Sequence, residues 1–104
     1  MFGRTNINTE VARCRATEGA VLIDVRSREE FEQGHIPGAV RMDPGDLYLA
    51  DELIPELDAP VFLYCLSGTR SDRAAAALRE MGYDNAVSIG GIIAWRGELV
   101  TGSE

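Results

Sequence analysis

Two short runs of apolar residues stand out along the chain. Residues 20–25 and 61–65 are almost continuously hydrophobic, without the alternation of a half-exposed strand. Apolar runs of about four to eight residues that lack alternation are typical of strands buried on both faces of a sheet. The pattern therefore predicts two central strands of a parallel sheet that helices cover.

Helical spacing is clearest in one segment that follows the second strand. Five small or apolar residues recur there at helical intervals: Ala74, Ala75, Ala77, Leu78 and Met81. This spacing predicts a helix over residues 71–81, which Gly82 ends. Weaker patterns predict further short helices over residues 7–16, 27–33, 43–51 and 92–95.

Strands and helices alternate in this prediction, because two shorter strands are expected at residues 39–42 and 86–89. Such alternation predicts an α/β fold with a central, mostly parallel sheet flanked by helices on both faces. A chain of 104 residues, 45% of them hydrophobic, has room for one modest core. We therefore expect a single domain over residues 1–104, with its core over about 5–99 and a frayed tail over 100–104.

Composition narrows the possible partners. Ten basic residues against 17 acidic ones give a formal net charge of −7, which disfavours binding to nucleic acid or to acidic membranes. No apolar run approaches the roughly 18 residues of a membrane span, and the first four residues lack the apolar run of a secretory signal. We therefore expect a cytoplasmic protein, although a cleaved leader would already be missing from this sequence.

The cysteines and the one histidine do not predict a metal site or a disulfide. Cys14 and Cys65 lie in different sequence contexts, and an intracellular chain would keep both reduced. Cys14 falls on the apolar side of the first predicted helix, beside Val11, which favours burial over a reactive role. We therefore expect no metal ion.

The segment from Cys65 to Ser71 is the strongest candidate for chemistry. It follows a predicted central strand and precedes a predicted helix, which is where ligands bind in open α/β sheets. Gly68 allows the backbone to curl around the sulfur, and Arg70 adds a positive charge. We therefore expect Cys65 to favour the thiolate, with loop amides holding its sulfur or an anionic donor. A cysteine at the end of a core strand is often merely buried, but Cys, Gly and Arg within six residues favour function.

Four motifs resemble those of the rhodanese family, in the family's order and over about residues 20–97. They are Asp24-Val25-Arg26 with Glu30-Phe31, Gly34 to Ala39, the loop from Cys65 to Arg70, and Gly90-Gly91-Ile92 through Trp95. The resemblance implies the rhodanese fold and a sulfurtransferase that needs no metal or organic cofactor. It also implies that Cys65 is the nucleophile that carries sulfur as a persulfide.

The resemblance further implies a substrate-binding loop, formed by Leu66, Ser67, Gly68, Thr69 and Arg70. Cys65 would take sulfane sulfur from a donor such as thiosulfate, release sulfite, and pass the sulfur to cyanide or a thiol. Leu66 and Thr69 depart from family members whose loops carry additional basic side chains, which leaves Arg70 as the only charge in the loop. A protein persulfide or a small-thiol persulfide is therefore an alternative donor.

Three other functions share part of this pattern. A carrier that passes persulfide sulfur from one protein to another would have the same loop but poor turnover of thiosulfate. Cysteine-dependent phosphatases and arsenate reductases place five residues between Cys and Arg, whereas four separate Cys65 from Arg70. A noncatalytic binding module of the family is common where the cysteine has been lost, but Cys65 and Arg70 are both present in this chain. We therefore expect an enzyme that acts on small sulfur compounds.

The remaining polar residues of the motifs suit structural roles. Asp24, Arg26 and Glu30 are placed for an ion pair that ties the first central strand to the short helix after it. His35 lies in a turn between Gly34 and Pro37, where an imidazole more often bonds backbone groups than acts as a base. Trp95 is expected in the core.

Overall fold

The structure, a computed structural model, describes residues 6–103. The first four residues, for which no secretory signal is expected, lie outside these residues, as do Thr5 and Glu104. The elements are α1 (Ile7–Arg15), β1 (Val21–Asp24), α2 (Arg28–Gln33), β2 (Val40–Arg41), η1 (Pro44–Leu49), α3 (Ala50–Leu53), β3 (Val61–Cys65), α4 (Thr69–Glu80), β4 (Ala86–Gly91) and η2 (Ile92–Ala94). Over this part of the chain, every helix is too short or too polar to cross a membrane.

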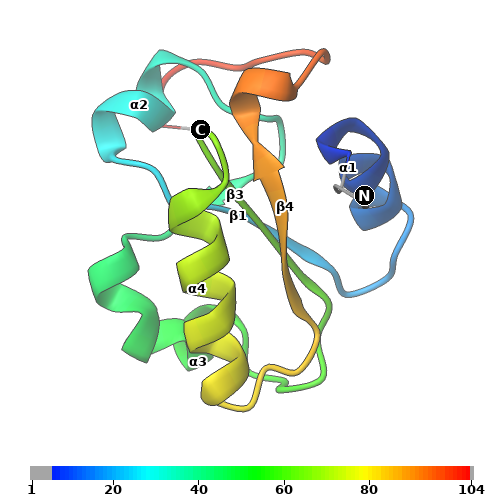
Figure 1. The fold of residues 1–104 in the computed structure, drawn as a ribbon, viewed down its shortest axis with the longest axis vertical. Coiled ribbons are helices and arrows are strands. Elements are labelled where there is room, and N and C mark those ends of the chain that lie inside the picture. The colour runs from blue at the N-terminus through cyan, green and yellow to red at the C-terminus, as the bar shows by residue number, and fades with distance from the viewer. Residues whose placement is uncertain (1–5, 104) are drawn as a thin grey trace.

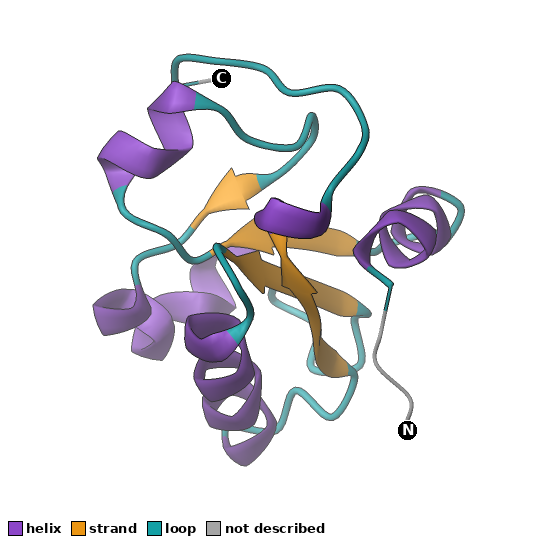
Figure 2. Ribbon diagram, turned by 45° about the horizontal axis from the view of Figure 1, so that its top comes forward, coloured by secondary structure: helices purple, strands orange, loops and turns teal. Residues whose placement is uncertain are grey.

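The four strands form one parallel sheet in the order β2-β1-β3-β4. The two most hydrophobic runs, β1 and β3, are the central strands, as expected of apolar strands that are buried on both faces. They pair in register from Val21 opposite Val61 to Asp24 opposite Tyr64. Figures 1 and 2 show α1 on one face of the sheet and α3 and α4 on the other. The expected α/β fold is therefore confirmed.

Side-chain alternation along β3 divides the core into two clusters. Phe62 and Tyr64 pack with α1, whereas Leu63 and Cys65 pack with α4. All five residues of β3 are buried, which explains why the strand is uniformly apolar. This alternation decides on which face of the sheet each side chain of the strand lies.

Two expected helices differ from the prediction. The helix over residues 43–51 is instead a 3-10 helix, η1, followed by the single α-helical turn of α3. The helix expected over residues 92–95 is one 3-10 turn, because Trp95 already has extended backbone angles and two β-branched isoleucines favour helix only weakly. The last helix therefore adds little cover to the sheet, and β4 continues to Gly91.

The chain after η2 returns to α2. The backbone N–H of His35 donates to Val100 (2.8 Å), Val100 donates back (2.9 Å), and Gly102 donates to the Glu32 carbonyl (2.8 Å). Residues 100 and 102 are thus held to the domain, whereas fraying was expected from residue 100 onwards. His35 is fully buried, stacks on Phe31 and has its Nδ1 2.8 Å from the Phe31 carbonyl oxygen, as its expected structural role requires.

Candidate active site

Cys65 is the last residue of β3, at the carboxyl edge of the sheet, on the face that α4 covers. Its partner on the neighbouring strand β4 is Gly91. The pairing of β3 with β4 is irregular between Leu63 and Cys65. The residue is 1% exposed, so the sulfur is shielded from solvent by the loop that follows. The fold therefore places the predicted nucleophile between a strand end and the start of α4.

The backbone of the loop folds back over the Cys65 sulfur. The N–H of Gly68 donates to Sγ (3.0 Å), and the N–H of Ser71 donates to it at 3.3 Å. Gly68 precedes α4 with φ 114° and ψ −19°, a left-handed conformation that glycine adopts without a Cβ clash. The two N–H groups belong to the unpaired amides of a helix start, so they carry partial positive charge towards the sulfur.

Two serines that were not predicted as site residues complete this environment. The fully buried Ser71 hydroxyl lies 3.5 Å from Sγ, 2.8 Å from the Ser88 hydroxyl and 3.1 Å from the Gly68 carbonyl oxygen, to which it can donate. Ser71 ends the candidate segment but was assigned no role in it, and Ser88 is a polar residue inside a predicted strand. The second fact alone could have indicated a polar site near β4.

The pKa of Cys65 reflects two opposing effects. Burial raises the pKa, while the hydrogen bond with the Ser71 hydroxyl and those from the N–H groups of Ser71, Gly68 and Ser67 lower it. The hydrogen bonds prevail, and the pKa lies below the ordinary value for a cysteine. A buried sulfur that is nonetheless biased towards the thiolate is suited to nucleophilic attack.

Removing the Ser71 hydroxyl should raise the pKa of Cys65, because the hydrogen bond between this hydroxyl and the sulfur lowers that pKa. Alkylation by iodoacetamide at pH 7 should therefore slow by about threefold to tenfold in Ser71→Ala. The rate should approach that of the wild type at alkaline pH, where both proteins are ionised. The pH at which the alkylation rate inflects gives the pKa of Cys65 directly. Ser103→Ala, at an exposed serine, is the control. An unchanged inflection would rule out this role for Ser71.

The ion-pair cluster expected for Asp24, Arg26 and Glu30 forms only in part, because Glu30 has another partner. Asp24 and Arg26 do form a buried pair, with Arg26 Nη2 2.8 Å from Asp24 Oδ2. Glu30 instead binds Arg70 in a fork, with Nη1 to Oε1 at 2.9 Å and Nη2 to Oε2 at 3.1 Å. The reason is topological, because α2 lies at the same edge of the sheet as the loop. Glu30 therefore ties α2 to the loop.

The other predicted loop residues form the outer surface of the site. Leu66, Ser67 and Thr69 are exposed, whereas Gly68 is buried beneath them. The Leu66 carbonyl accepts a hydrogen bond from the N–H of Ile93 (3.2 Å), which joins the loop to the turn after β4. The loop is thus held at Cys65 from the inside and at η2 from the outside.

Two residues with alternative interpretations lie away from the sulfur. Cys14 belongs to the core cluster around α1, on the opposite face of the sheet from Cys65, and burial raises its pKa. Trp95 is half-buried against that same cluster, and its indole N–H donates to the Glu98 carbonyl (2.9 Å). Trp95 therefore packs at the edge of the core, and its ring is only partly covered.

Comparison with known proteins adds an independent line of evidence. The family model described as the rhodanese-like domain matches residues 8–98. A sulfurtransferase of Allochromatium vinosum is 39% identical over 80% of this chain and 78% of its own length. The thiosulfate sulfurtransferase GlpE of Pseudomonas entomophila is 39% identical over 86% of this chain and 83% of its own. The structure of a human single-domain sulfurtransferase, TSTD1, has a TM-score of 0.73 at 31% identity, over 84% of this chain and 89% of that one.

Proposed function

This chain belongs to the rhodanese-like domain family, and from that premise we propose that Cys65 carries sulfane sulfur as a persulfide between a donor and a thiophilic acceptor. Its curated relatives are sulfurtransferases, so the chain is an enzyme of that class. The observation that carries the proposal is that the Cys65 sulfur accepts hydrogen bonds from two backbone N–H groups at the start of α4. Such a cradle stabilises a sulfur anion on either half of a transfer cycle.

In the first half-reaction, the Cys65 thiolate attacks the outer sulfur of thiosulfate. A bond forms between Sγ and that sulfur, the sulfur–sulfur bond of thiosulfate breaks, and sulfite leaves with the electron pair. The negative charge of the enzyme passes from Sγ to the outer sulfur of the persulfide. No proton is transferred in this step, which agrees with a sulfur whose hydrogen-bond partners are hydroxyl and amide groups.

In the second half-reaction, cyanide or a thiolate attacks the outer sulfur. The bond between the two persulfide sulfurs breaks, the product leaves as thiocyanate or as a new persulfide, and Cys65 returns to the thiolate. The amides that lower the pKa of Cys65 also make its thiolate a better leaving group here. The loop therefore assists both halves of the cycle.

We assign donor binding to the predicted loop residues: Leu66, Ser67, Gly68, Thr69 and Arg70. Arg70 keeps N–H groups that its two hydrogen bonds to Glu30 do not use, and these can bind the oxygens of an anionic donor. A persulfide carrier with poor thiosulfate turnover is a second candidate, because Glu30 neutralises the only charge in the loop. We also propose that the protein acts as a single domain in the cytoplasm.

The test is to incubate the purified protein with thiosulfate, follow its intact mass, and then add cyanide and assay thiocyanate. We expect a mass gain of one sulfur atom that cyanide removes. Sustained thiocyanate production supports the enzyme, whereas loading without turnover supports the carrier. If neither thiosulfate nor a persulfide donor changes the mass, the proposed function is wrong and the phosphatase alternative should be assayed.

A further inference from the structure

The charge of Arg70 is neutralised where a donor anion would approach. Both terminal nitrogens of its guanidinium bind Glu30, and both side chains are partly exposed, at 39% and 31%. Arg70 belongs to the loop that holds the Cys65 sulfur and interacts electrostatically with Cys65, so its ion pair with Glu30 forms part of the rim of the site. A donor that binds near Cys65 therefore meets a carboxylate as well as a guanidinium.

The fold fixes Glu30 in this position. Its Oε1 accepts the Ser27 N–H (2.9 Å) as well as Arg70 Nη1, and the Ser27 hydroxyl accepts the Glu30 N–H (3.1 Å). This capping box starts α2, so the carboxylate is oriented before any donor binds. Its hydrogen bond to Arg70 lowers the pKa of Glu30 to about 2, which keeps it ionised near neutral pH.

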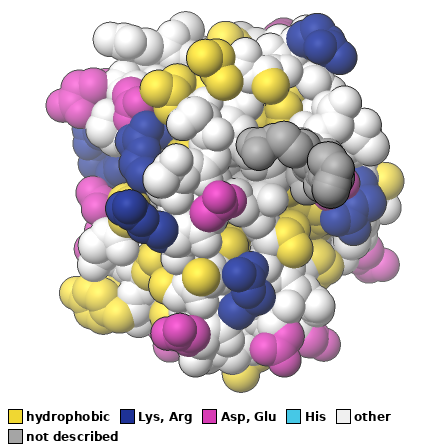
Figure 3. All heavy atoms as spheres, in the orientation of Figure 1, with side chains coloured by type: hydrophobic (Ala, Val, Ile, Leu, Met, Phe, Trp, Pro, Cys, Tyr) yellow, Lys and Arg dark blue, Asp and Glu magenta, His cyan; other side chains and the backbone are white. Residues whose placement is uncertain are grey.

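A second guanidinium close to Glu30 is paired as well. Arg26 interacts electrostatically with Glu30, but it is almost buried and bonded to Asp24, which is fully buried. The two pairs carry no net charge. Figure 3 shows the same mixing on the surface, where basic side chains lie beside acidic ones over α2 and the start of α4. No uncompensated cation among these four residues attracts a donor.

We propose that Glu30 is a specificity-determining residue that disfavours doubly charged sulfur donors relative to singly charged ones. The repulsion between its carboxylate and a donor grows with the number of charges on the donor, whereas amide cradling of the sulfur does not discriminate in this way. Thiosulfate carries two negative charges, and a thiosulfonate, with one oxygen replaced by carbon, carries one. The inference rests on the proposed function, because the discrimination acts on sulfur loading at Cys65.

The experiment compares loading of the wild type and Glu30→Gln by thiosulfate and by methanethiosulfonate. Both donors give the same Cys65 persulfide when their sulfur–sulfur bond breaks, and the leaving groups are sulfite and methanesulfinate. Gln keeps the Oε1 acceptor that Ser27 and Arg70 use but removes the negative charge. The measured quantity is the second-order rate of persulfide formation, from quenched intact mass.

We expect Glu30→Gln to load from thiosulfate about threefold to tenfold faster than the wild type at low ionic strength. The gain with methanethiosulfonate should be about the square root of that factor, because its charge is half as large. Salt should shrink both gains. A purely structural role for Glu30 would instead change both rates by the same factor.

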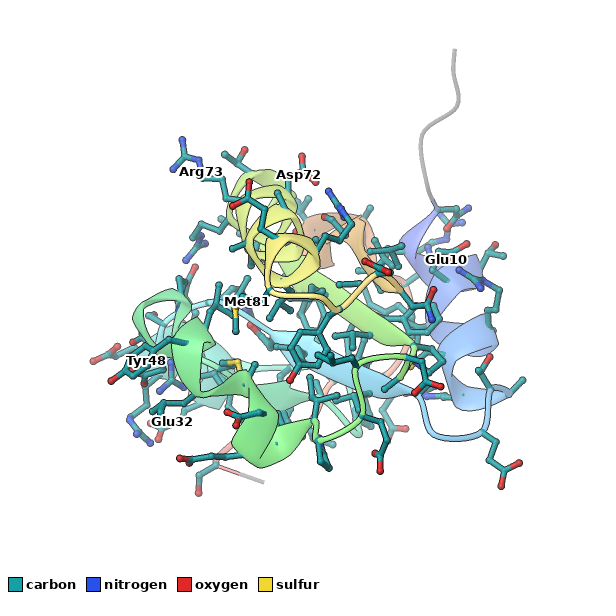
Figure 4. The ribbon with its side chains drawn as sticks, turned by 90° about the horizontal axis from the view of Figure 1, so that it is seen from below. Glu10, Glu32, Tyr48, Asp72, Arg73 and Met81 are labelled. Carbon is teal, nitrogen blue, oxygen red and sulfur yellow. The ribbon has the colours of Figure 1, made fainter. Side chains whose placement is uncertain are left out.

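Glu10→Gln is the matched control. Glu10 also binds an arginine, with Arg13 Nη2 2.7 Å from its Oε1, and its replacement changes the net charge equally. It lies on α1, and Figure 4 shows it on the opposite side of the molecule from Glu32 of α2. This variant should load from both donors at the wild-type rates. A gain as large as that of Glu30→Gln would trace the effect to net charge.

Equal gains, equal losses or no change with the two donors in Glu30→Gln would each overturn the proposal. Failure of the proposed function is a separate result, since the wild type would then load from neither donor. In that case, protection of Cys65 from iodoacetamide by sulfate still tests the charge effect. Sulfate should protect Glu30→Gln better than the wild type, and equal protection would contradict the role of Glu30.

Discussion

Cys65→Ser should lower sulfur transfer by about 10⁴-fold or more, because it removes the nucleophile that we propose to form the persulfide. A serine hydroxyl is not ionised by two backbone amides near neutral pH, and oxygen cannot form the sulfur–sulfur bond of the intermediate. The variant incubated with thiosulfate should therefore show no added sulfur in its intact mass and no thiocyanate after cyanide. Serine is nearly isosteric with cysteine, so the variant should keep the fold.

Cys14→Ser is the matched control for this experiment. Cys14 is buried on the opposite face of the sheet, and burial raises its pKa, so it is a poor nucleophile. Its replacement should leave sulfur loading intact. Loading that persists in Cys65→Ser, or that disappears in a folded Cys14→Ser, would contradict the assignment of the nucleophile.

Gly91→Ala should lower sulfur transfer by about 10²-fold, although Gly91 bears no functional group. A Cβ at this position would overlap the carbonyl group of Leu66 and the Cα of Ser67, which are backbone atoms of the loop. They cannot rotate away as a side chain could, so the whole loop has to move. The amides that hold the Cys65 sulfur would then lose their alignment. Overpacking of this kind also costs about 1–3 kcal/mol of stability.

Gly38→Ala separates steric overlap from the cost of backbone strain. Gly38 has φ 91°, and a Cβ there meets no atom within 4 Å. The variant should lose about 1–2 kcal/mol from the left-handed conformation and keep its rate of sulfur loading. Loading rates and denaturant unfolding of both variants give the comparison. Wild-type loading in Gly91→Ala would show that the loop tolerates the added methyl group.

The long elements and the loop could be predicted because their signals are local. The apolar runs of β1 and β3 and the helical spacing of α4 each reflect burial of a contiguous segment. The loop was equally visible, because Cys65, Gly68 and Arg70 lie within six residues. The short segments at 43–53 and 92–95 were predicted less well, since few residues decide between α-helix and 3-10 helix there.

The sequence by itself determined the fold class and the family, and it predicts the position of the nucleophile, because these depend on contiguous patterns. Only the tertiary structure decided which groups surround the sulfur. Glu30 reaches Arg70 across 40 positions, and Ser88 reaches Ser71 across 17. These partners meet because parallel strands bring their carboxyl ends, and the segments that follow them, to one edge of the sheet. Pairwise contacts of that kind leave no periodic trace in a single sequence.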